Sequence, residues 1–284
     1  MRVLVLGGTS SVGGYLMPRL SQAGYTVVAT SRRPPVSLVP AGIEWVKLDL
    51  QRARAVDELP SSDVVISMMP IWITAEVCTA MSSKGLARVI AISSTSAVTK
   101  LESSDEGERI FCRLLLGGEA DLIALQPRIS STILRPTMIY GGPSDRNVSR
   151  VATHLKRFRL FPLVANGVGL RQPVHADDIA AAIVQVLATS GSEGKTYDLS
   201  GGEVLSFRAM VERIGMDIGA QPIFVNIPLA VARVVLRAVS IMPRFREIPF
   251  ESVSRMGKDM AFDHSLAKRD FGFSPRGFEP RNSL

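Results

Sequence analysis

The sequence predicts an α/β fold built on a doubly wound parallel sheet, with a smaller, mostly helical lobe toward the C-terminus. Short apolar runs rich in Val and Ile alternate with helix-like stretches over the first 140 residues. The runs do not alternate in polarity, which is typical of parallel strands covered on both faces. The chain also begins with such a run and breaks at once into the glycine-rich turn Gly7–Gly14. Together these patterns indicate a parallel sheet with right-handed crossovers.

The strands and helices follow one another in a regular order. Strands are predicted at Val3–Leu6, Thr26–Ala29, Trp45–Lys47, Val64–Ser67, Val89–Ile92, Thr132–Arg135 and Thr196–Leu199. Helices are predicted at Val12–Ala23, Trp72–Lys84, Glu106–Leu125 and from an Asp177–Asp178 cap to about Ala188. Ser10 or Ser11 is the expected N-cap of the first helix.

We expect residues 1–200 to form the sheet domain and 201–284 the smaller lobe, with the loop at 141–172 contributing to that lobe. The apolar stretch Pro228–Ile241 contains Arg233 and Arg237. It is too short and too charged to span a bilayer, so no integral membrane segment is predicted. We expect it to pack on a core as a basic-faced helix, and the alternative is that it lies on a membrane surface.

Composition excludes several classes of protein. With 284 residues, 46% hydrophobic and 21% charged, the chain can bury a large core. The net charge of +7 is spread along a sequence with only 6% aromatic residues, so nucleic-acid binding is not expected.

Cys78 and Cys112 are expected as buried free thiols in a reducing compartment. The first residues lead directly into a strand, so we expect a cytoplasmic protein, and no metal site is predicted.

The glycine turn predicts a dinucleotide site, because a strand, a glycine turn and a helix N-terminus present backbone N–H groups to a pyrophosphate. It reads Gly7-x-x-Ser10-x-x-Gly13, with a serine at the middle glycine position. Ser10 costs backbone freedom if φ must be positive there. The candidate ligands in this turn are Gly7, Thr9, Ser10, Ser11, Val12 and Gly13. A plain strand–turn–helix connection without a ligand is the alternative.

The end of the second strand predicts the preferred cofactor. An acidic side chain there binds the ribose 2′-OH of NAD, whereas an arginine accommodates a 2′-phosphate. The chain has Ser31, Arg32 and Arg33 at this place and no carboxylate. We therefore expect NADP(H) to be preferred over NAD(H). The alternative is that both arginines are solvated loop residues.

Several segments in the same order resemble the short-chain dehydrogenase/reductase superfamily, in the extended or atypical branch of the NAD-dependent epimerases and dehydratases. Besides the glycine turn, they are Ser93–Ser96, Ile133–Gly141 ("LRP…YG"), Gln172–Asp178 ("V-H-x-D-D") and Phe271–Pro275 ("GF-x-P"). The resemblance runs from residue 1 to about 280 and implies a Rossmann-type sheet. The further cofactor contacts that it implies are Asp49, Leu50, Met68, Met69, Pro70, Ser93, Pro136 and Met138.

This chain departs from the family pattern at the catalytic tyrosine and lysine. The family's proton donor is a tyrosine with a lysine four residues later, in the helix after the fifth strand. If Glu119 is the glutamate that often follows this lysine, Phe111 stands at the tyrosine position and Leu115 at the lysine position. No tyrosine of this chain has a lysine four residues later. Losing a general acid typically lowers the rate by about 10²–10⁴. The candidate substitutes are Ser94, Thr95 and Lys100, with backbone-bonded hydroxyls and a solvated lysine as alternatives.

Members of this branch often act on nucleotide sugars, which implies a substrate site in the second lobe. The candidate substrate contacts are Tyr140, Arg146, Asn147 and Arg171, with Asp145, Lys156, Arg157 and Arg159 as further charged residues nearby in the sequence. The alternatives are a Tyr140 ring that packs at the domain junction and charges that simply face solvent. His175 is expected to be structural, bonded near Asp177 or Asp178.

These observations favour an NADP-dependent oxidoreductase or epimerase acting on a phosphorylated or nucleotide-linked metabolite through a non-standard proton donor. Phe111 and Leu115 motivate the alternative, a catalytically silent NADPH-binding regulator or assembly factor. The expected partner is a small-molecule substrate, and both a monomer and a homodimer stay open.

Overall fold

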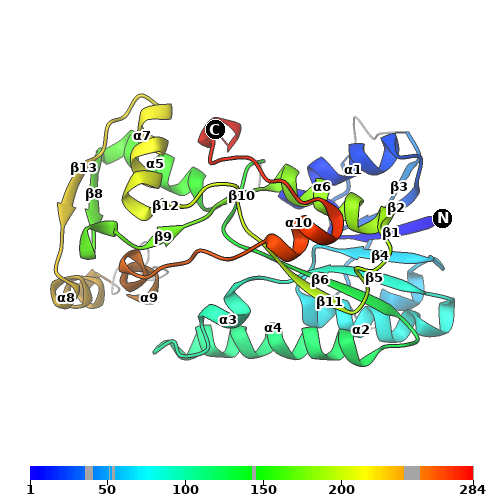
Figure 1. Cartoon of the computed structure of the whole chain (residues 1–284). Helices are drawn as coiled ribbons and strands as arrows, with labels where there is room; N and C mark the ends of the chain where they lie inside the picture. Colours follow the sequence, from blue (N-terminus) through cyan, green and yellow to red (C-terminus); the bar gives the residue numbers. More distant parts are fainter. Residues whose placement is uncertain (36–40, 51, 53–54, 143–144, 240–249, 284) are drawn as a thin grey trace.

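A seven-stranded parallel sheet forms the centre of the computed structural model, which describes residues 1–284 except 36–40, 51, 53–54, 143–144, 240–249 and 284 (Figure 1). Its strand order is β11-β6-β5-β4-β1-β2-β3, and every neighbouring pair is parallel. The strands are β1 (Arg2–Leu6), β2 (Thr26–Ser31), β3 (Ile43–Lys47), β4 (Val64–Ser67), β5 (Arg88–Ile92), β6 (Ser130–Pro136) and β11 (Lys195–Leu199). The predicted doubly wound parallel sheet is therefore confirmed.

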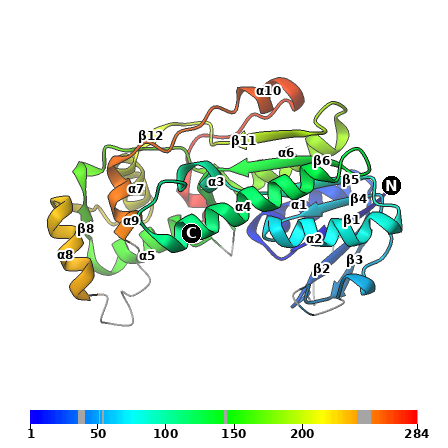
Figure 2. The same cartoon turned by 90° about the horizontal axis from the view of Figure 1, so that it is seen from below.

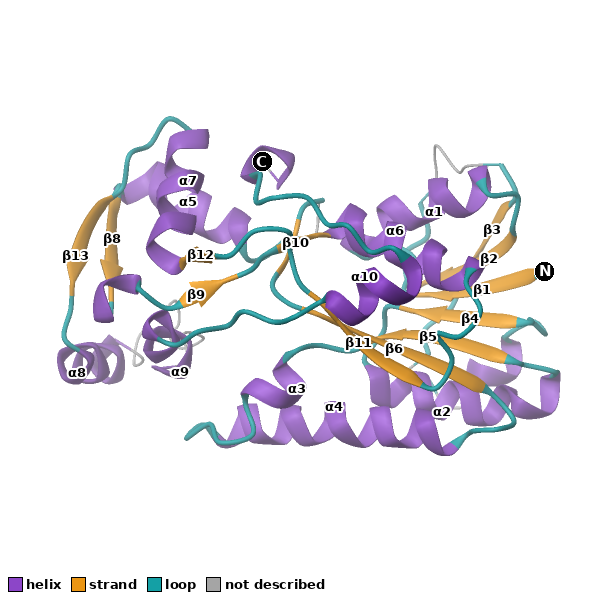
Figure 3. Ribbon diagram, in the orientation of Figure 1, coloured by secondary structure: helices purple, strands orange, loops and turns teal. Residues whose placement is uncertain are grey.

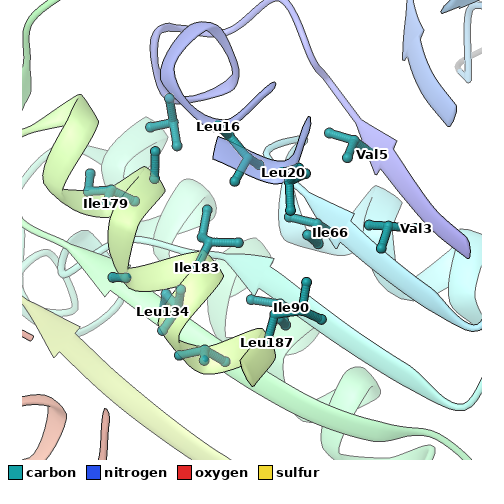
Figure 4. Close-up of a cluster of buried hydrophobic side chains, with 14 of the residues drawn as sticks. Val3, Val5, Leu16, Leu20, Ile66, Ile90, Leu134, Ile179, Ile183 and Leu187 are labelled. Atoms are coloured by element: carbon teal, nitrogen blue, oxygen red, sulfur yellow. The ribbon is translucent and has the colours of Figure 1, made fainter. Parts of the chain in front are cut away.

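Helices cover both faces of this sheet (Figure 3). One face carries α1 (Ser11–Gln22), α6 (Ala176–Ala188) and α10 (Ser265–Phe271), and the other carries α2 (Ile71–Met81) and α4 (Glu106–Ala124). Successive strand residues point to opposite faces, so each strand feeds two apolar layers. In the first layer, Val3 and Ile66 of the sheet pack with Leu16, Leu20 and Ile183 of the helices (Figure 4). Burial on both sides explains the unbroken apolar runs.

The second lobe lies beyond the carboxyl ends of the strands and has its own core (Figures 1 and 2). Its elements are α5 (Val148–Phe158), β8 (Leu160–Leu163), β9 (Leu170–Arg171), β12 (Leu205–Ser206), α7 (Phe207–Asp217), β13 (Ile223–Asn226), α8 (Leu229–Val239) and α9 (Phe250–Ser254). Leu155, Phe161, Met210 and Ile214 are buried together in this core. The short strands β7 (Ile139–Tyr140) and β10 (Val174–His175) pair in parallel where the lobes meet.

The two lobes are interleaved in the sequence. Helix α5 and strand β8 precede residue 200 yet share a core with α7 of the second lobe. In contrast, α10 and the residues after it return to the sheet domain, where Phe271 and Phe273 join the core beneath α6. Arg276 fastens this return, because its guanidinium lies 2.7 Å from Asp177 and 2.8 Å from Asp178. A single boundary at residue 200 thus does not separate the lobes.

One local prediction is wrong and another is only partly tested. Helix α6 is capped by His175, whose Nδ1 accepts a hydrogen bond from the backbone N–H of Asp177, and not by the Asp177–Asp178 pair. In α8, Ala232 is buried and Val234 is 68% exposed, whereas residues 240–241 of the predicted stretch lie outside the described residues, so its core packing stays a prediction. Among the helices of the described ranges, none has the length and apolarity needed to cross a bilayer.

Candidate functional site: a dinucleotide cleft

The turn between β1 and α1 has the geometry of an anion cradle. Gly7 has a φ of 76°, in the left-handed region that favours glycine. A Cβ on Gly13 would lie 2.2 Å from the carbonyl oxygen of Gly8, so only glycine permits this close approach. Ser10 instead has a φ of −68° and a ψ of 165°, which any residue adopts. The middle position of the motif therefore tolerates serine.

Ser10 also has a structural task in this turn. Its Oγ accepts a hydrogen bond of 3.1 Å from the backbone N–H of Gly13 and caps α1, as expected. Neither Asp nor Glu occurs in the first turn of α1. The positive end of the helix dipole thus faces the turn without a competing carboxylate from that first turn, which favours an anionic ligand.

Two adjoining clefts open at the carboxyl ends of β1 and β4, where the strand order reverses and where open α/β sheets bind ligands. The β2-side cleft has a volume of about 360 Å³ and the α5-side cleft about 290 Å³. Ser10 and Met68 line both. The structure brings many of the predicted cofactor residues to the β2-side cleft: Gly7, Thr9, Ser10, Ser31, Arg32, Asp49, Leu50, Met68, Met69 and Pro70. Ser11 and Val12 line the α5-side cleft.

The remaining predicted cofactor residues are near cleft residues in the sequence, but they are not among the described residues that line either cleft. They are Gly13, Arg33, Ser93, Pro136 and Met138. Gly13 acts through the turn geometry. The backbone N–H of Arg33 donates to Ser31 Oγ at 3.1 Å, and Pro136 supplies a carbonyl to Thr95.

The polar groups at the end of β2 are arranged around Ser31. Its Oγ lies 3.0 Å from Thr9 Oγ1, and this contact connects β2 to the glycine turn. Arg32 is exposed and lines the cleft. Asp49, which follows β3, is the only carboxylate among the described residues that line this cleft. The end of β2 thus carries a guanidinium and no acid, which suits a phosphate better than a ribose hydroxyl.

The α5-side cleft is poor in groups that exchange protons near neutral pH. Its described lining residues include Ser10, Ser11, Asp145, Arg146 and Asn147, but no tyrosine, lysine, histidine or cysteine. Both carboxylate oxygens of Asp145 accept backbone N–H groups at the start of α5, including Asn147 N at 2.7 Å. These hydrogen bonds hold the carboxylate against the start of α5.

The serine-rich end of β5 is held by the surrounding backbone and by a buried ion pair. Ser93 donates a hydrogen bond to Glu119 on α4, and Arg135 Nε donates to the same carboxylate at 2.9 Å. Ser94 Oγ accepts from the backbone N–H of Ser96 at 3.1 Å, at the start of α3 (Ser96–Thr99). Thr95 donates to the Pro136 carbonyl at 3.3 Å. Ser94 still has a hydroxyl hydrogen to donate, whereas Thr95 already uses its own.

Phe111 and Leu115 supply no polar group from α4. The Phe111 ring is 38% exposed and meets the Trp72 ring edge-on, with centroids 6.0 Å apart. Leu115 is 4% exposed and belongs to the core between α4 and the sheet. Neither side chain can donate a proton.

Lys100 is held by an acid rather than directed at either cleft. Its Nζ lies 3.3 Å from Glu108 Oε1 and 5.8 Å from the centre of the Phe111 ring. Arg255 from the second lobe binds the same carboxylate through both terminal nitrogens, at 2.6 and 2.7 Å. Burial raises the pKa of Glu108, but hydrogen bonds from Arg255 and Ser103 and the charge of Lys100 outweigh it and bring the pKa to about 2. Sequence reasoning missed Glu108 and Arg255, which lie 147 positions apart.

The predicted substrate residues are not brought together. Arg146 and Asn147 line the α5-side cleft. Tyr140 is fully buried, where its hydroxyl donates to Gly277 O and accepts from Glu279 N. Arg171 is buried and donates to the carbonyls of Leu170, Lys258 and Arg255. Lys156, Arg157 and Arg159 are exposed around the opposite end of α5.

His175 has a structural place, as expected. Its ring packs between those of Tyr15 and Tyr140, with centroids 5.3 and 5.0 Å away. Burial lowers its pKa, and the charge of Arg276 lowers it further. The neutral ring caps α6 and fills the space left by the missing side chain of Gly141. In the described part of the chain, no group of three or more His, Cys, Asp or Glu residues is arranged to hold a metal ion.

Comparison with known proteins finds a family model that matches part of the chain and several relatives. Residues 3–111 match the model of the "NAD dependent epimerase/dehydratase family". A mitochondrial "NADH dehydrogenase [ubiquinone] 1 alpha subcomplex subunit 9" from Arabidopsis thaliana is 34% identical over 122 residues, which cover 42% of this chain and 29% of the relative. The protein of the same name from Dictyostelium discoideum is 26% identical over 265 residues, 86% of this chain and 71% of the relative.

The fold is shared with a solved sugar-nucleotide complex. The structure "MoeE5 in complex with UDP-glucuronic acid and NAD" aligns with a TM-score of 0.72 at 19% identity, covering 100% of this chain and 96% of the other. The sheet order, the glycine turn and the matching family model agree with one another. Residues 3–111 therefore resemble the NAD-dependent epimerase/dehydratase family, and the whole chain has the fold of the MoeE5 structure.

Proposed function

We propose that this protein binds NADP(H) in preference to NAD(H) and retains it as a bound, non-reacting ligand, as a regulator or a subunit of a larger assembly. The observation that carries this proposal is the α5-side cleft. This cleft adjoins the glycine turn between β1 and α1, and its described lining contains no tyrosine, lysine, histidine or cysteine. A nicotinamide supplies hydride chemistry when bound, but carbonyl reduction also needs a proton donor.

The residues present fit a dinucleotide. The cradle at Gly13 would be filled by a Cβ, and Gly7 has the positive φ that brings the backbone close to a ligand. The N-terminus of α1 would bind the pyrophosphate, and Asp49 is suited to contact the adenine side. Arg32 would bind a ribose 2′-phosphate through its guanidinium.

A silent role also agrees with the neighbourhood of Lys100. Its ammonium lies 3.3 Å from the Glu108 carboxylate and 5.8 Å from the centre of the Phe111 ring. The Arabidopsis and Dictyostelium relatives are named as subunits of NADH dehydrogenase, which supports a binding role within an assembly.

A titration with NADPH and with NADH, followed by nicotinamide fluorescence, tests the cofactor. We expect NADPH to bind at least about tenfold more tightly, and Arg32→Ala to remove most of this difference. Arg128→Ala, an exposed arginine at the opposite end of the sheet, is the matched control and should leave both affinities unchanged. Equal affinities in the unmodified protein would contradict the NADP(H) assignment.

Prolonged incubation of the NADPH complex with ketones and UDP-linked keto sugars tests the silent role. We expect no NADPH oxidation above the protein-free rate. The second candidate function is a reductase or epimerase acting on a nucleotide sugar, because Ser94 keeps a donor hydrogen and the MoeE5 structure holds UDP-glucuronic acid. Oxidation that disappears in Ser94→Ala, with NADPH affinity intact, would establish this second function instead.

A further inference from the structure

Two adjacent methionines lie at the dinucleotide clefts. Met68 lines both clefts, and Met69 lines the β2-side cleft. Both side chains are half-buried, whereas the core methionines Met17, Met81 and Met210 are at most 3% exposed. No other residue that contains sulfur is among the described residues that line either cleft. A small oxidant that enters the clefts therefore meets two thioethers.

The backbone around this pair is fixed by hydrogen bonds. Met68 follows β4 directly, and its N–H donates to the Leu6 carbonyl of β1 at 3.0 Å. The N–H of Met69 donates to Ser67 Oγ at 3.2 Å, and this Oγ lies 2.6 Å from Thr74 Oγ1 on α2. Ser67 and Thr74 are fully buried. A backbone shift at the pair would break these bonds, so the two side chains are held at the clefts.

Met69 also packs against the glycine turn. A Cβ placed on Gly7 would lie 3.3 Å from Met69 Cγ, which leaves little room between this side chain and the turn. Because the sulfur is bonded to this Cγ, an oxygen atom added to the sulfur would occupy space in the cleft or displace the turn. The resulting sulfoxide is polar, whereas the thioether is apolar.

The cysteines of this chain are poor targets for the same oxidants. Cys78 and Cys112 are both 0% exposed. Burial raises the pKa of Cys78 to about 12, and burial also raises the pKa of Cys112. The thiolate is the nucleophilic form of cysteine, so both thiols react slowly with peroxides at neutral pH. Oxidation of sulfur near the dinucleotide clefts therefore falls to the methionine pair.

We propose that Met68 and Met69 form an oxidation-sensitive modification site that controls dinucleotide binding, an inference that rests on the proposed binding of NADP(H). Hydrogen peroxide transfers one oxygen atom to each sulfur. The thioether loses two electrons and becomes a sulfoxide, and the peroxide gains them and leaves as water. The sulfoxides weaken NADPH binding, and bound NADPH covers the two sulfur atoms. Oxidation and occupancy by the dinucleotide thus oppose each other.

Peroxide treatment followed by NADPH titration tests this site. We expect sulfoxides at Met68 and Met69 in peptide mass spectra, and a rise in the NADPH dissociation constant of at least about tenfold. Saturating NADPH during the treatment should slow oxidation of the pair at least about fivefold. It should leave the oxidation rate of Met216, which is 66% exposed on α7, unchanged. Methionine sulfoxide reductases with a dithiol should restore the affinity, which distinguishes sulfoxides from irreversible damage.

Leucine variants locate the effect. In Met68→Leu with Met69→Leu, peroxide should change the NADPH dissociation constant by less than about twofold, whatever its starting value. Met216→Leu is the matched control and should lose affinity as the unmodified protein does.

Four results would overturn this inference and leave the proposed function intact. They are an undiminished loss in the double leucine variant, full NADPH affinity with both sulfoxides formed, equal oxidation of the pair with and without NADPH, and no recovery after the reductases. Absence of NADPH binding before any treatment would overturn the proposed function and this inference together.

Discussion

Glu108 forms an ion pair with Arg255 across the two lobes, through two hydrogen bonds of 2.6 and 2.7 Å. The carboxylate also binds Ser103 at 2.8 Å and Lys100 at 3.3 Å. Because its side chain is only 10% exposed, solvent screens these contacts weakly. This one carboxylate therefore connects the segment between β5 and α4, through Lys100 and Ser103, to Arg255 of the second lobe.

Glu108→Gln should lower the free energy of unfolding at pH 7 by about 3 kcal/mol, since it removes the carboxylate charge that both Arg255 and the half-buried Lys100 contact. Glu106→Gln, on the exposed side of the same helix end, is the control and should lower the free energy of unfolding much less, because solvent screens its ion pairs. Urea denaturation of both variants measures the difference. Equal effects would mean that Glu108 acts as an ordinary surface charge.

The same carboxylate predicts a pH dependence. Its pKa in the folded protein, about 2, lies below the ordinary value of 4.5, so its stabilising effect is complete above about pH 4.5. That effect is lost as the pH falls toward 2. The difference in unfolding free energy between the unmodified protein and Glu108→Gln should therefore shrink between pH 4.5 and 2. A difference that stays constant over this window would contradict the assignment.

Gly13→Ala should abolish NADPH binding, because its Cβ would clash with the Gly8 carbonyl and displace the turn. Gly14→Ala is the matched control, since no atom lies within 4 Å of a Cβ placed there. As a helix-interior glycine, Gly14 should even gain about 0.5–1 kcal/mol in stability on this change. Fluorescence titration and thermal unfolding of both variants give the answer. Retained NADPH affinity in a folded Gly13→Ala protein would remove the turn from the binding site.

Tyr140→Phe should lower stability by about 1–2 kcal/mol, since it removes the hydrogen bonds to Gly277 and Glu279 from a buried place. It should leave NADPH affinity unchanged. Chemical denaturation and cofactor titration check the two halves of this expectation. Reduced ligand binding with full stability would instead support the substrate contact that the sequence suggested.

Arg276→Gln should release the segment after α10 from the sheet domain and lower stability by about 2–3 kcal/mol. Arg269→Gln is the control. Arg269 is highly exposed, and within the described residues its ion pair is with the neighbouring Asp270. Limited proteolysis should cut the first variant near residue 276 and spare the second. Resistance of Arg276→Gln to proteolysis would show that the apolar contacts of Phe273 suffice.

Local features of the sequence predicted the sheet domain well. Val3–Leu6 and the glycines after it are contiguous, and the need for backbone freedom at Gly7 and Gly13 is a property of those positions alone. The capping role of Ser10 is equally local. The parallel, doubly wound arrangement could be predicted because apolar strands that alternate with helices allow few topologies.

Contacts between residues far apart in the chain could not be predicted from the sequence. Glu108 and Arg255 carry no motif, and only the packing of the lobes brings them together. Tyr140 stands next to the cleft residue Gly141 in the sequence, yet its own side chain is buried in the core of the second lobe. The amphipathic pattern of α8 indicated a helix with an apolar side, but such a pattern does not determine which surface covers that side.

The return of α10 to the sheet domain has a consequence for synthesis on the ribosome. The layer that begins with Val3 is completed by Phe271 and Phe273, which are made some 270 residues later. Until these two rings emerge, a nascent chain holds α6 with part of its apolar side in water. Such an intermediate exposes the kind of surface that chaperones recognise. Chains halted before α10 should therefore be aggregation-prone even though every strand of the sheet has already been translated.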